Sequence, residues 1–349
     1  DLYGEKIINI PYFNEDKIIN SFKKEGINYN PEIGEINEGK DYEKNNRNYY
    51  DLYIPYSSLK RKDKNNDIIL FIHGGGWAFG KKEFISFYTV RYAKMGYITA
   101  QMNHTYLSKG NKHISIFKIL DEITACLANI KLKLKNLGFN ENKLELILQG
   151  GSAGAHLCLL YSYMIKKPLI PIKFIINSVA PVTLDPDNFL TTKPNSPPLE
   201  NIEPDDIREA KEKDLIILMN GNETGVHMNH LYLVNFINGW LGKPLNDSID
   251  EIFLDIEKMI INKNSSIFKE RFNKASYAFP INYVTEESIP TLCLYGGKDE
   301  EVGVAQYAKL KEAFMNKSND NISLVYFKYG THNVFYNRSE ERRVGKECR

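Results

Sequence analysis

A chain of 349 residues with 42% hydrophobic residues is long enough to bury one large core, and its 45 Lys and Arg against 44 Asp and Glu give a formal net charge of +1. A charge this balanced excludes the strong field that attracts nucleic acid or an anionic membrane surface. No apolar run approaches the roughly 20 residues that span a bilayer, so we expect neither a nucleic-acid partner nor a membrane span.

The cysteines and the N-terminus bear on the compartment. Cys126, Cys158, Cys293 and Cys348 form no C-x-x-C pair, and the first three lie in apolar segments that indicate buried thiols. No signal peptide is evident, and the chain begins at Asp1 rather than Met, so we expect that an N-terminal piece was removed or not captured. These features favour a cytoplasmic protein.

The first 47 residues are polar, with scattered Gly and Pro, and we interpret them as an N-terminal lead-in with one helix over residues 16–24. Alternating aromatic residues then predict an edge strand over 48–55. Apolar, β-branched runs over 67–73 and 97–102 are typical of buried strands. The main domain is therefore expected to begin at residue 48.

A triple-glycine loop follows the strand at 67–73, in the motif His73-Gly74-Gly75-Gly76-Trp77. Three glycines leave backbone N–H groups uncovered and able to approach a ligand closely. That suits an oxyanion hole, whose donors must lie about 3 Å from the developing O⁻. We therefore interpret the loop as the source of oxyanion donors.

A rival interpretation of this loop is phosphate binding, because Gly75-x₄-Gly80-Lys81 follows a strand. The pattern fails at Lys82, where a Ser or Thr should bind magnesium. Trp77 and Phe79 would also crowd a phosphate. The sequence therefore favours the oxyanion loop over the phosphate loop.

A nucleophile turn stands at the centre of the chain. The strand at 144–148 runs into Gly150-x-Ser152-x-Gly154, and a mostly apolar segment follows to Ile165. A serine squeezed between a strand and a helix has a strained backbone, and side chains at the flanking positions would clash, so glycines are needed there. The turn projects the hydroxyl away from the sheet, and the helix N-terminus favours negative charge. Ser152 is therefore the predicted nucleophile.

Regular alternation predicts the fold class. Apolar residues at helical spacing predict a helix over 113–137, and further strands are expected at 173–179, 289–295 and 323–329, with a helix over 304–317. Such alternation predicts an α/β fold with a mostly parallel sheet and helices on both faces. Ligands of such sheets bind beyond the carboxyl ends of the strands.

The alternation breaks between residues 184 and 279, where Pro-rich loops and two predicted helices, 228–240 and 249–262, occur. This stretch is too long for a simple crossover, so we expect an inserted lid over the site. Glu223, His227 and His230 lie within it, but their loose spacing indicates surface or lid residues, and no metal or other cofactor is expected.

Two more residues complete a predicted triad. Asp299 follows the strand at 289–295, and His332 follows the last strand, so both are expected at the same sheet edge as Ser152. The order Ser, Asp, His matches the order of hydrolases with this topology. Glu300 or Glu301 remains an alternative to Asp299 as the acid.

Together these motifs resemble the α/β-hydrolase superfamily, and its esterase branch most closely. The resemblance covers roughly residues 48–337 and extends to carboxylesterases, acetyl esterases, feruloyl-esterase-like proteins and kynurenine formamidases. It implies Ser152 as nucleophile, His332 as general base and acid, and Asp299 as the acid that orients it. The implied oxyanion donors are the backbone N–H groups of Gly75, Gly76 and Ala153. Trp77 and Phe79 are candidate pocket residues, although a core position is the default interpretation for an aromatic residue.

The implied activity is hydrolysis of a small-molecule carboxylic ester with a small acyl group, through an acyl-enzyme. An arylformamidase that hydrolyses amides of the N-formylkynurenine type is one alternative, and a non-catalytic binding protein on the same scaffold is another. His73 is expected to brace the glycine loop, and His156 to pack behind the nucleophile turn. The sequence does not predict the oligomeric state.

The last twelve residues, 338–349, lack the Asn and Ile bias of the rest. They resemble a translated sequencing-adapter sequence, and we interpret them as a non-native tail outside the fold.

Overall fold

The computed structural model describes residues 5–11, 47–107, 115–184, 233–234, 236–243, 248–255, 260–297, 299 and 301–334. The helix expected at 16–24 and the tail at 338–349 lie outside these residues, as do Glu223, His227 and His230. Most of the expected lid between 184 and 279 is likewise outside them.

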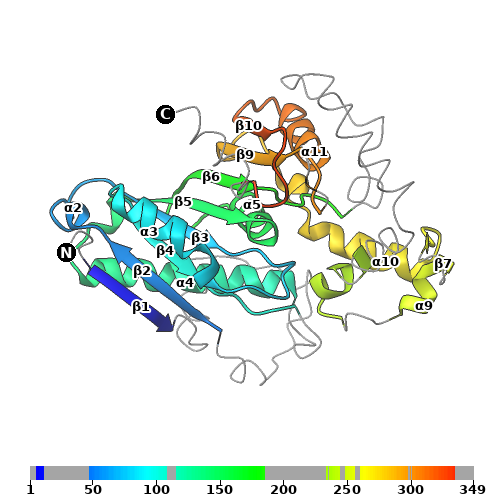
Figure 1. Cartoon of the computed structure of the whole chain (residues 1–349), viewed down its shortest axis with the longest axis horizontal. Coiled ribbons are helices and arrows are strands. Elements are labelled where there is room, and N and C mark those ends of the chain that lie inside the picture. The colour runs from blue at the N-terminus through cyan, green and yellow to red at the C-terminus, as the bar shows by residue number, and fades with distance from the viewer. Residues whose placement is uncertain are drawn as a thin grey trace, which may run out of the picture.

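One sheet organises the described part of the chain (Figure 1). Its strands run in the spatial order β1-β2-β4-β3-β5-β6-β9-β10. Every neighbouring pair from β4 to β10 is parallel, whereas β2 pairs antiparallel with both β1 and β4. The predicted mostly parallel sheet is therefore confirmed. In chain order the strands are β1 (Glu5–Pro11), β2 (Tyr49–Ile54), β3 (Asn66–Ile72), β4 (Ile98–Met102), β5 (Leu144–Gly151), β6 (Ile172–Ser178), β9 (Thr291–Gly296) and β10 (Ile322–Phe327).

The prediction that residues 48–55 form an edge strand was wrong. β1 pairs with the outer side of β2, with Ile7 opposite Leu52 and Ile10 opposite Tyr50. Tyr50 and Leu52 are accordingly fully buried. The sheet thus begins inside the first 47 residues, which we had expected to be a lead-in, because the seven-residue β1 carries too little alternation to stand out from its polar surroundings.

Helices cover both faces of the sheet. The chain moves from β3 to β4 in one direction and from β4 through β5 to β6 in the other. Because such crossovers are right-handed, α3 lies on the face opposite α4 and α5, and α4 contacts α5. The helices on these crossovers are α3 (Ser86–Lys94), α4 (Ile116–Asn136) and α5 (Ala153–Met164), and α11 (Ala305–Met315) connects β9 to β10. Shorter helices are α2 (Tyr56–Leu59), η3 (Lys82–Ile85) and η4 (Glu141–Lys143).

Burial explains which helices the sequence revealed. The predicted helix at 113–137 is confirmed as α4, whose apolar positions at helical spacing are all buried, among them Ile116, Leu120, Ile123, Leu127, Ile130 and Leu134. By contrast, α3 was not predicted. It buries only Thr89 and Ala93 and exposes Phe87, so its sequence shows no apolar stripe.

The helix expected over 249–262 was wrong. Among the described residues of this stretch only those of α9 (Ile249–Ile252) are helical, and β7 (Phe253–Asp255) then pairs antiparallel with β8 (Ile260–Ile261). Phe253 is buried whereas Leu254 is 71% exposed, which is the in-and-out alternation of a strand. Figure 1 shows α9, β7 and α10 (Ser266–Ala275) gathered at one end of the molecule. Two short turns of helix, η5 (Ser276–Ala278) and η6 (Pro280–Tyr283), lead back to the sheet.

Candidate active site

The predicted site residues lie at one edge of the sheet because they follow the carboxyl ends of parallel strands. The triple-glycine loop follows β3, Ser152 follows β5, and Asp299 and His332 follow β9 and β10. The register places the ends of β3 and β5 side by side, with Ile72 opposite Gly150. Phe327 stands opposite Gly296 at the ends of β10 and β9.

Ser152 occupies a strained turn between β5 and α5. Its φ is 53° and its ψ is −124°, a backbone conformation that non-glycine residues seldom adopt. The Ser152 N–H donates to the Ser178 carbonyl of the neighbouring strand (2.8 Å), and its carbonyl accepts from His156 in the first turn of α5 (3.0 Å). These two hydrogen bonds fix the backbone on both sides of Ser152, so the residue stays in its strained conformation at the N-terminus of the helix.

Two glycines of the motif are required by close packing, as predicted. A Cβ on Gly150 would lie 2.4 Å from the Gly154 carbonyl carbon, and a Cβ on Gly154 would lie 2.1 Å from the Ile72 carbonyl oxygen. These neighbours are backbone atoms, which cannot move aside as a side chain can. Gly151 differs, because a Cβ there would meet nothing within 4 Å.

The triple-glycine loop lies against the serine. A Cβ on Gly74 would approach the Gly151 carbonyl oxygen to 2.7 Å and the Ser152 Cβ to 3.2 Å. Gly75 and Gly76 both have positive φ, 114° and 53°. Among the described residues the amides of Gly75, Gly76 and Ala153 donate no backbone hydrogen bond. Oxyanion donation by these three amides stays a prediction, and the absence of a backbone acceptor for them is compatible with it.

Asp299 and His332 form the second half of the site. His332 Nδ1 lies 3.0 and 2.9 Å from the two carboxylate oxygens of Asp299. The Asp299 side chain is fully buried, and its Oδ1 also accepts from the Glu301 and Val302 amides, both at 2.9 Å. These bonds fix the orientation of the Asp299 side chain, which accepts from Nδ1 and leaves Nε2 as the outward-facing nitrogen of the ring.

The remaining nitrogen of His332 faces a second carboxylate. Nε2 lies 3.5 Å from Glu301 Oε2, and the Glu301 side chain is 73% exposed. Burial lowers the pKa of His332, but the hydrogen bond and charge of Asp299 and the charge of Glu301 outweigh it, so the pKa lies above its ordinary value of 6.5. In the part of the chain that the structure describes, no hydrogen bond joins His332 to the Ser152 hydroxyl. The structure therefore brings together two members of the predicted triad.

The two candidate pocket residues differ sharply in exposure. Phe79 is 64% exposed beside the loop, whereas Trp77 is 2% exposed. The Trp77 indole N–H donates to His156 Nδ1 (3.2 Å), and its ring packs edge-on against Phe236 and Trp240. Trp77 is thus a core residue that anchors the loop to the helical segment at 236–240, which agrees with the default interpretation of this aromatic residue rather than with a place in the pocket.

His156 packs behind the nucleophile turn, as expected. It accepts from Trp77 at Nδ1, so its Nε2 carries the proton and donates to the Ala278 carbonyl (2.9 Å). Burial lowers its pKa to about 4. His156 therefore stays neutral and fully engaged, and it is unsuited to general base catalysis.

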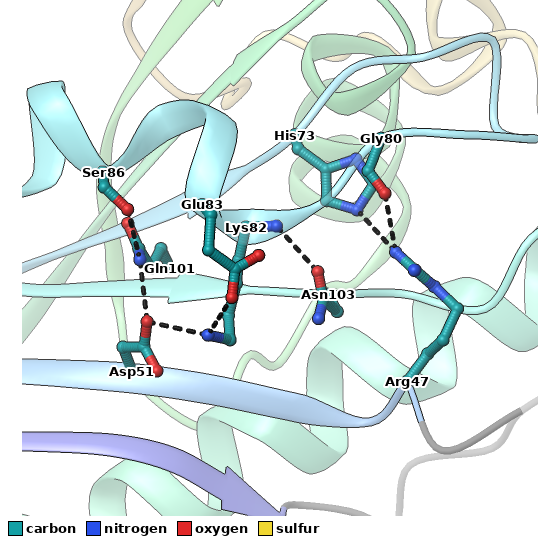
Figure 2. A network of polar contacts seen from close by, with 9 residues as sticks. All are labelled: Arg47, Asp51, His73, Gly80, Lys82, Glu83, Ser86, Gln101 and Asn103. Carbon is teal, nitrogen blue, oxygen red and sulfur yellow. Dashed lines mark hydrogen bonds and ion pairs between the residues drawn. The ribbon is translucent and has the colours of Figure 1, made fainter.

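Lys82, which stands where a phosphate loop would need Ser or Thr, has a buried side chain. Its ammonium is 3% exposed and bonds Asp51 at 2.9 Å and Glu83 at 2.7 Å, so it points away from the loop (Figure 2). From the sequence, Lys82 was considered only as a residue that stands where a phosphate loop needs Ser or Thr. A lysine between Lys81 and Glu83 carries no signal that a distant aspartate on β2 will bury it.

Neither a metal-binding cluster nor a membrane-spanning helix occurs among the described residues. Within them, no group of three or more His, Cys, Asp or Glu side chains could hold a metal ion. No helix among those residues is long and apolar enough to cross a membrane. Cys126, Cys158 and Cys293 are buried free thiols, as predicted, and Cys348 lies outside the described part.

Comparison with known proteins adds sequence relatives. Residues 50–179 match the BD-FAE family model. A probable isoprenylcysteine alpha-carbonyl methylesterase of Arabidopsis thaliana is 29% identical over 124 residues. That alignment covers 35% of this chain, and the chain spans about a quarter (27%) of the relative's length. The region that matches the family model, residues 50–179, contains the triple-glycine loop and Ser152.

Solved structures extend the likeness to the fold. Esterase B of Lactobacillus rhamnosis superposes with a TM-score of 0.54 at 12% identity, over 99% of this chain and 84% of that one. A thermophilic esterase of Thermogutta terrifontis, solved with propionate bound, gives a TM-score of 0.51 at 14% identity, over 85% of each chain. The chain therefore has the α/β-hydrolase fold that the motifs predicted.

Proposed function

We propose that this protein is a serine hydrolase that cleaves carboxylic esters of small acyl groups through an acyl-enzyme. The observation that carries the proposal is the strained turn at Ser152, which lies in contact with a loop of open backbone amides. A strained serine flanked by obligatory glycines at a strand–helix junction is the arrangement that exposes a nucleophile. The Asp299–His332 pair at the same sheet edge supplies an oriented base.

In the first step, His332 Nε2 takes the proton of the Ser152 hydroxyl as Oγ attacks the ester carbonyl carbon. The carbonyl oxygen becomes an oxyanion that accepts hydrogen bonds from Gly75, Gly76 and Ala153. His332 then gives its proton to the departing alkoxide, which leaves as the alcohol. Water, deprotonated by His332, attacks the acyl carbon, and His332 returns that proton to Ser152 Oγ as its bond to the acyl carbon breaks, which releases the acid.

This chemistry requires Nε2 of His332 to exchange Glu301 for the Ser152 hydroxyl. Glu301 is mostly exposed, and an exposed ion pair contributes only about 0–1 kcal/mol. Catalytic hydrogen bonds are often long or misaligned before substrate binds. The exchange is therefore energetically small, and Asp299 keeps hold of Nδ1 throughout.

The preference for a small acyl group is argued from a solved neighbour and from the side chains around the glycine loop. The Thermogutta terrifontis esterase was solved with propionate, a short acyl group, whereas the methylesterase relative by its name acts on a methyl ester, in which the alcohol and not the acyl group is small. On this chain, Phe79 and Phe236 both approach Gly76, where a Cβ would lie 3.4 Å from Phe236 and 3.8 Å from Phe79. Aromatic rings close to an oxyanion donor favour a compact acyl group over a long one.

The test compares the wild-type protein with Ser152→Ala on chromogenic acetate, butyrate and decanoate esters and on N-formylkynurenine. We expect hydrolysis of the short esters, with kcat reduced by about 10⁶-fold in the variant, since the nucleophile itself is lost. A fluorophosphonate probe should label Ser152 in the wild type alone. Equal rates for both proteins would reject the assignment of Ser152 as nucleophile. Preferred cleavage of N-formylkynurenine would favour the arylformamidase over the esterase. No labelling and no turnover would indicate a non-catalytic scaffold.

A further inference from the structure

A polar cluster contacts both ends of the glycine loop, and apart from the expected bracing by His73 neither the motifs nor the proposed reaction accounts for it. Figure 2 shows that its side chains come from the segment before β2, from β2 itself, from η3 and from the end of β4. They meet the loop at its two ends, His73 and Gly80. The cluster has two parts, one built on Arg47 and the other on Lys82.

Arg47 bonds both ends of the loop. Its Nη2 donates to the Gly80 carbonyl at 2.9 Å and lies 3.5 Å from His73 Nε2, while its Nε donates to the His104 carbonyl at 3.0 Å. The guanidinium also stacks over the Tyr106 ring, 3.6 Å from its centroid. The Tyr106 hydroxyl donates to the same Gly80 carbonyl. One planar cation with several donors therefore ties together three separate segments.

The contact with Arg47 sets the state of His73. An arginine can only donate, so His73 Nε2 must accept and Nδ1 must carry the proton, which it donates to the Gly74 carbonyl at 2.7 Å. The His73 ring stacks on that of His104, with centroids 4.3 Å apart. Burial and then the neighbouring His104 hold the pKa of His73 well below its ordinary value of 6.5. His73 is thus neutral and locked onto the first glycine of the loop.

The two ends of the loop also touch each other. A Cβ on Gly80 would lie 2.5 Å from the Gly74 carbonyl oxygen and 2.7 Å from His73 Nδ1. Between them the Ala78 and Phe79 amides both donate to the Gly75 carbonyl at 3.0 Å. Holding the Gly80 carbonyl therefore holds Gly74 and turns the Gly75 carbonyl inward. A peptide whose carbonyl is fixed also has a fixed N–H direction, which applies to the next residue, Gly76.

Lys82 clamps the exit from the loop. Its backbone N–H donates to Asn103 Oδ1 at 2.7 Å, and its buried ammonium bonds Asp51 on β2. The Asp51 carboxylate also accepts from Gln101 on β4 at 2.8 Å. This part fixes the chain two residues after Gly80 to the body of the sheet.

From this geometry we infer that Arg47 is a positioning residue for the oxyanion donors of the proposed esterase, acting through Gly80 and His73 on Gly74–Gly76. The inference rests on the proposed function. Arg47 touches no reacting atom, so its effect must pass through the direction of the loop amides. Donors that are aimed at the developing O⁻ lower the barrier of the chemical step, whereas ground-state binding of the ester depends on them little.

The experiment compares wild type, Arg47→Met, Arg47→Lys and the control Lys62→Met. Lys62 also donates from a cation to a backbone carbonyl, that of Leu137 at 2.6 Å, but at the C-terminal end of α4 and away from the loop. For Arg47→Met we expect kcat on a short ester to fall about 10- to 100-fold, less than the 10²–10³-fold loss typical of removing a donor outright. KM should change by less than about threefold, because ground-state binding is largely retained.

The other variants separate positioning from general stability. Arg47→Lys should recover part of kcat, because one ammonium can reach Gly80 or His104 but cannot reproduce the planar fork, and it serves in place of Arg47→Met if that variant does not fold. Lys62→Met should keep kcat within about twofold of the wild type. A parallel rise in KM, or an equal kcat loss in Lys62→Met, would overturn the inference.

Hydrogen exchange of the peptide covering residues 73–80 gives a readout that does not need activity. Exchange there should accelerate in Arg47→Met and stay unchanged in Lys62→Met. Unchanged exchange at 73–80 in both Arg47 variants would reject the inference whether or not the protein is an esterase. Absence of ester hydrolysis by the wild-type protein would instead reject the proposed function.

Discussion

The Asp299 carboxylate determines which nitrogen of His332 is left to react. It contacts Nδ1 with both oxygens and is itself held by two backbone amides, so its orientation is fixed. Glu301, the alternative acid that the sequence left open, lies instead at Nε2. The buried partner orients the imidazole, and the exposed one only adds charge.

Replacing Glu301 tests this division at the level of pH dependence. Catalysis needs neutral His332, so kcat/KM should rise as pH passes through the His332 pKa, and its acidic limb should lie above 6.5, the ordinary value. Glu301→Gln removes one of the two charges that raise this pKa, so we expect the limb to move to lower pH. The measurement is kcat/KM on a short ester from about pH 5 to pH 9, the range in which histidine titrates. A limb that stays in place would contradict the role given to Glu301.

The same shift has a consequence for stability. A His332 pKa that is raised in the folded state stabilises the fold below the unfolded value of 6.5, and this stabilisation is lost as pH rises through the folded pKa. Glu301→Gln should therefore lower the unfolding free energy more at about pH 5.5 than at pH 9, and by no more than about 1 kcal/mol because the pair is exposed.

At the scale of elements, α5 can leave β5 only over a surface without side chains. Gly154, in the first turn of α5, lies directly on the last carbonyl of β3, and Gly150 lies under the same turn. The glycine pattern is therefore a packing requirement between one helix and two strands. It also explains why the nucleophile stands at a fixed height above the sheet.

Alanine at two neighbouring glycines separates packing from propensity. Gly154→Ala should destabilise the fold by about 3 kcal/mol or more, because its Cβ would meet backbone of β3 at 2.1 Å. Helix propensity alone would favour this alanine by about 1 kcal/mol, so the sign is diagnostic. Gly151→Ala is the matched control, since its Cβ meets nothing within 4 Å, and its unfolding free energy should stay within about 1 kcal/mol of the wild type. Denaturant unfolding measures both, and equal values would refute the packing argument.

At the scale of the whole molecule, β1 covers an edge of the sheet that would otherwise be open. Ile10 is 8% exposed and stands opposite Tyr50. Without β1, the outer hydrogen-bonding groups of β2 would face solvent, and such an edge invites pairing with another chain.

Deletion of residues 1–11 should therefore lower stability and promote association. Loss of the Ile10 side chain alone removes about 1.5–3 kcal/mol of burial, and the exposed β2 edge should give concentration-dependent oligomers in size-exclusion chromatography. The matched control removes residues 338–349, the predicted non-native tail, and should leave unfolding and elution unchanged. A protein whose stability and elution do not respond to the first deletion would show that β1 is dispensable.

How much could be predicted depended on the range of the interaction. The nucleophile turn, the glycine loop and the positions of Asp299 and His332 follow from local patterns, since strand alternation and glycine requirements involve near neighbours in the chain. α3 and β7 escaped prediction because their burial patterns are set by contacts with distant elements. For Trp77 the sequence left a pocket position and a core position open, and packing against residues 236–240 decided for the core.

The amino-acid sequence by itself determined the fold class and the identity of the candidate nucleophile, base and acid, because parallel strands deliver whatever follows their carboxyl ends to one edge of the sheet. The tertiary structure alone decided that Asp299 rather than Glu301 holds Nδ1, that Lys82 is buried against Asp51, and that Arg47 reaches both ends of the glycine loop. Those contacts join residues far apart in the chain, and their energies depend on burial and orientation, which no local pattern encodes.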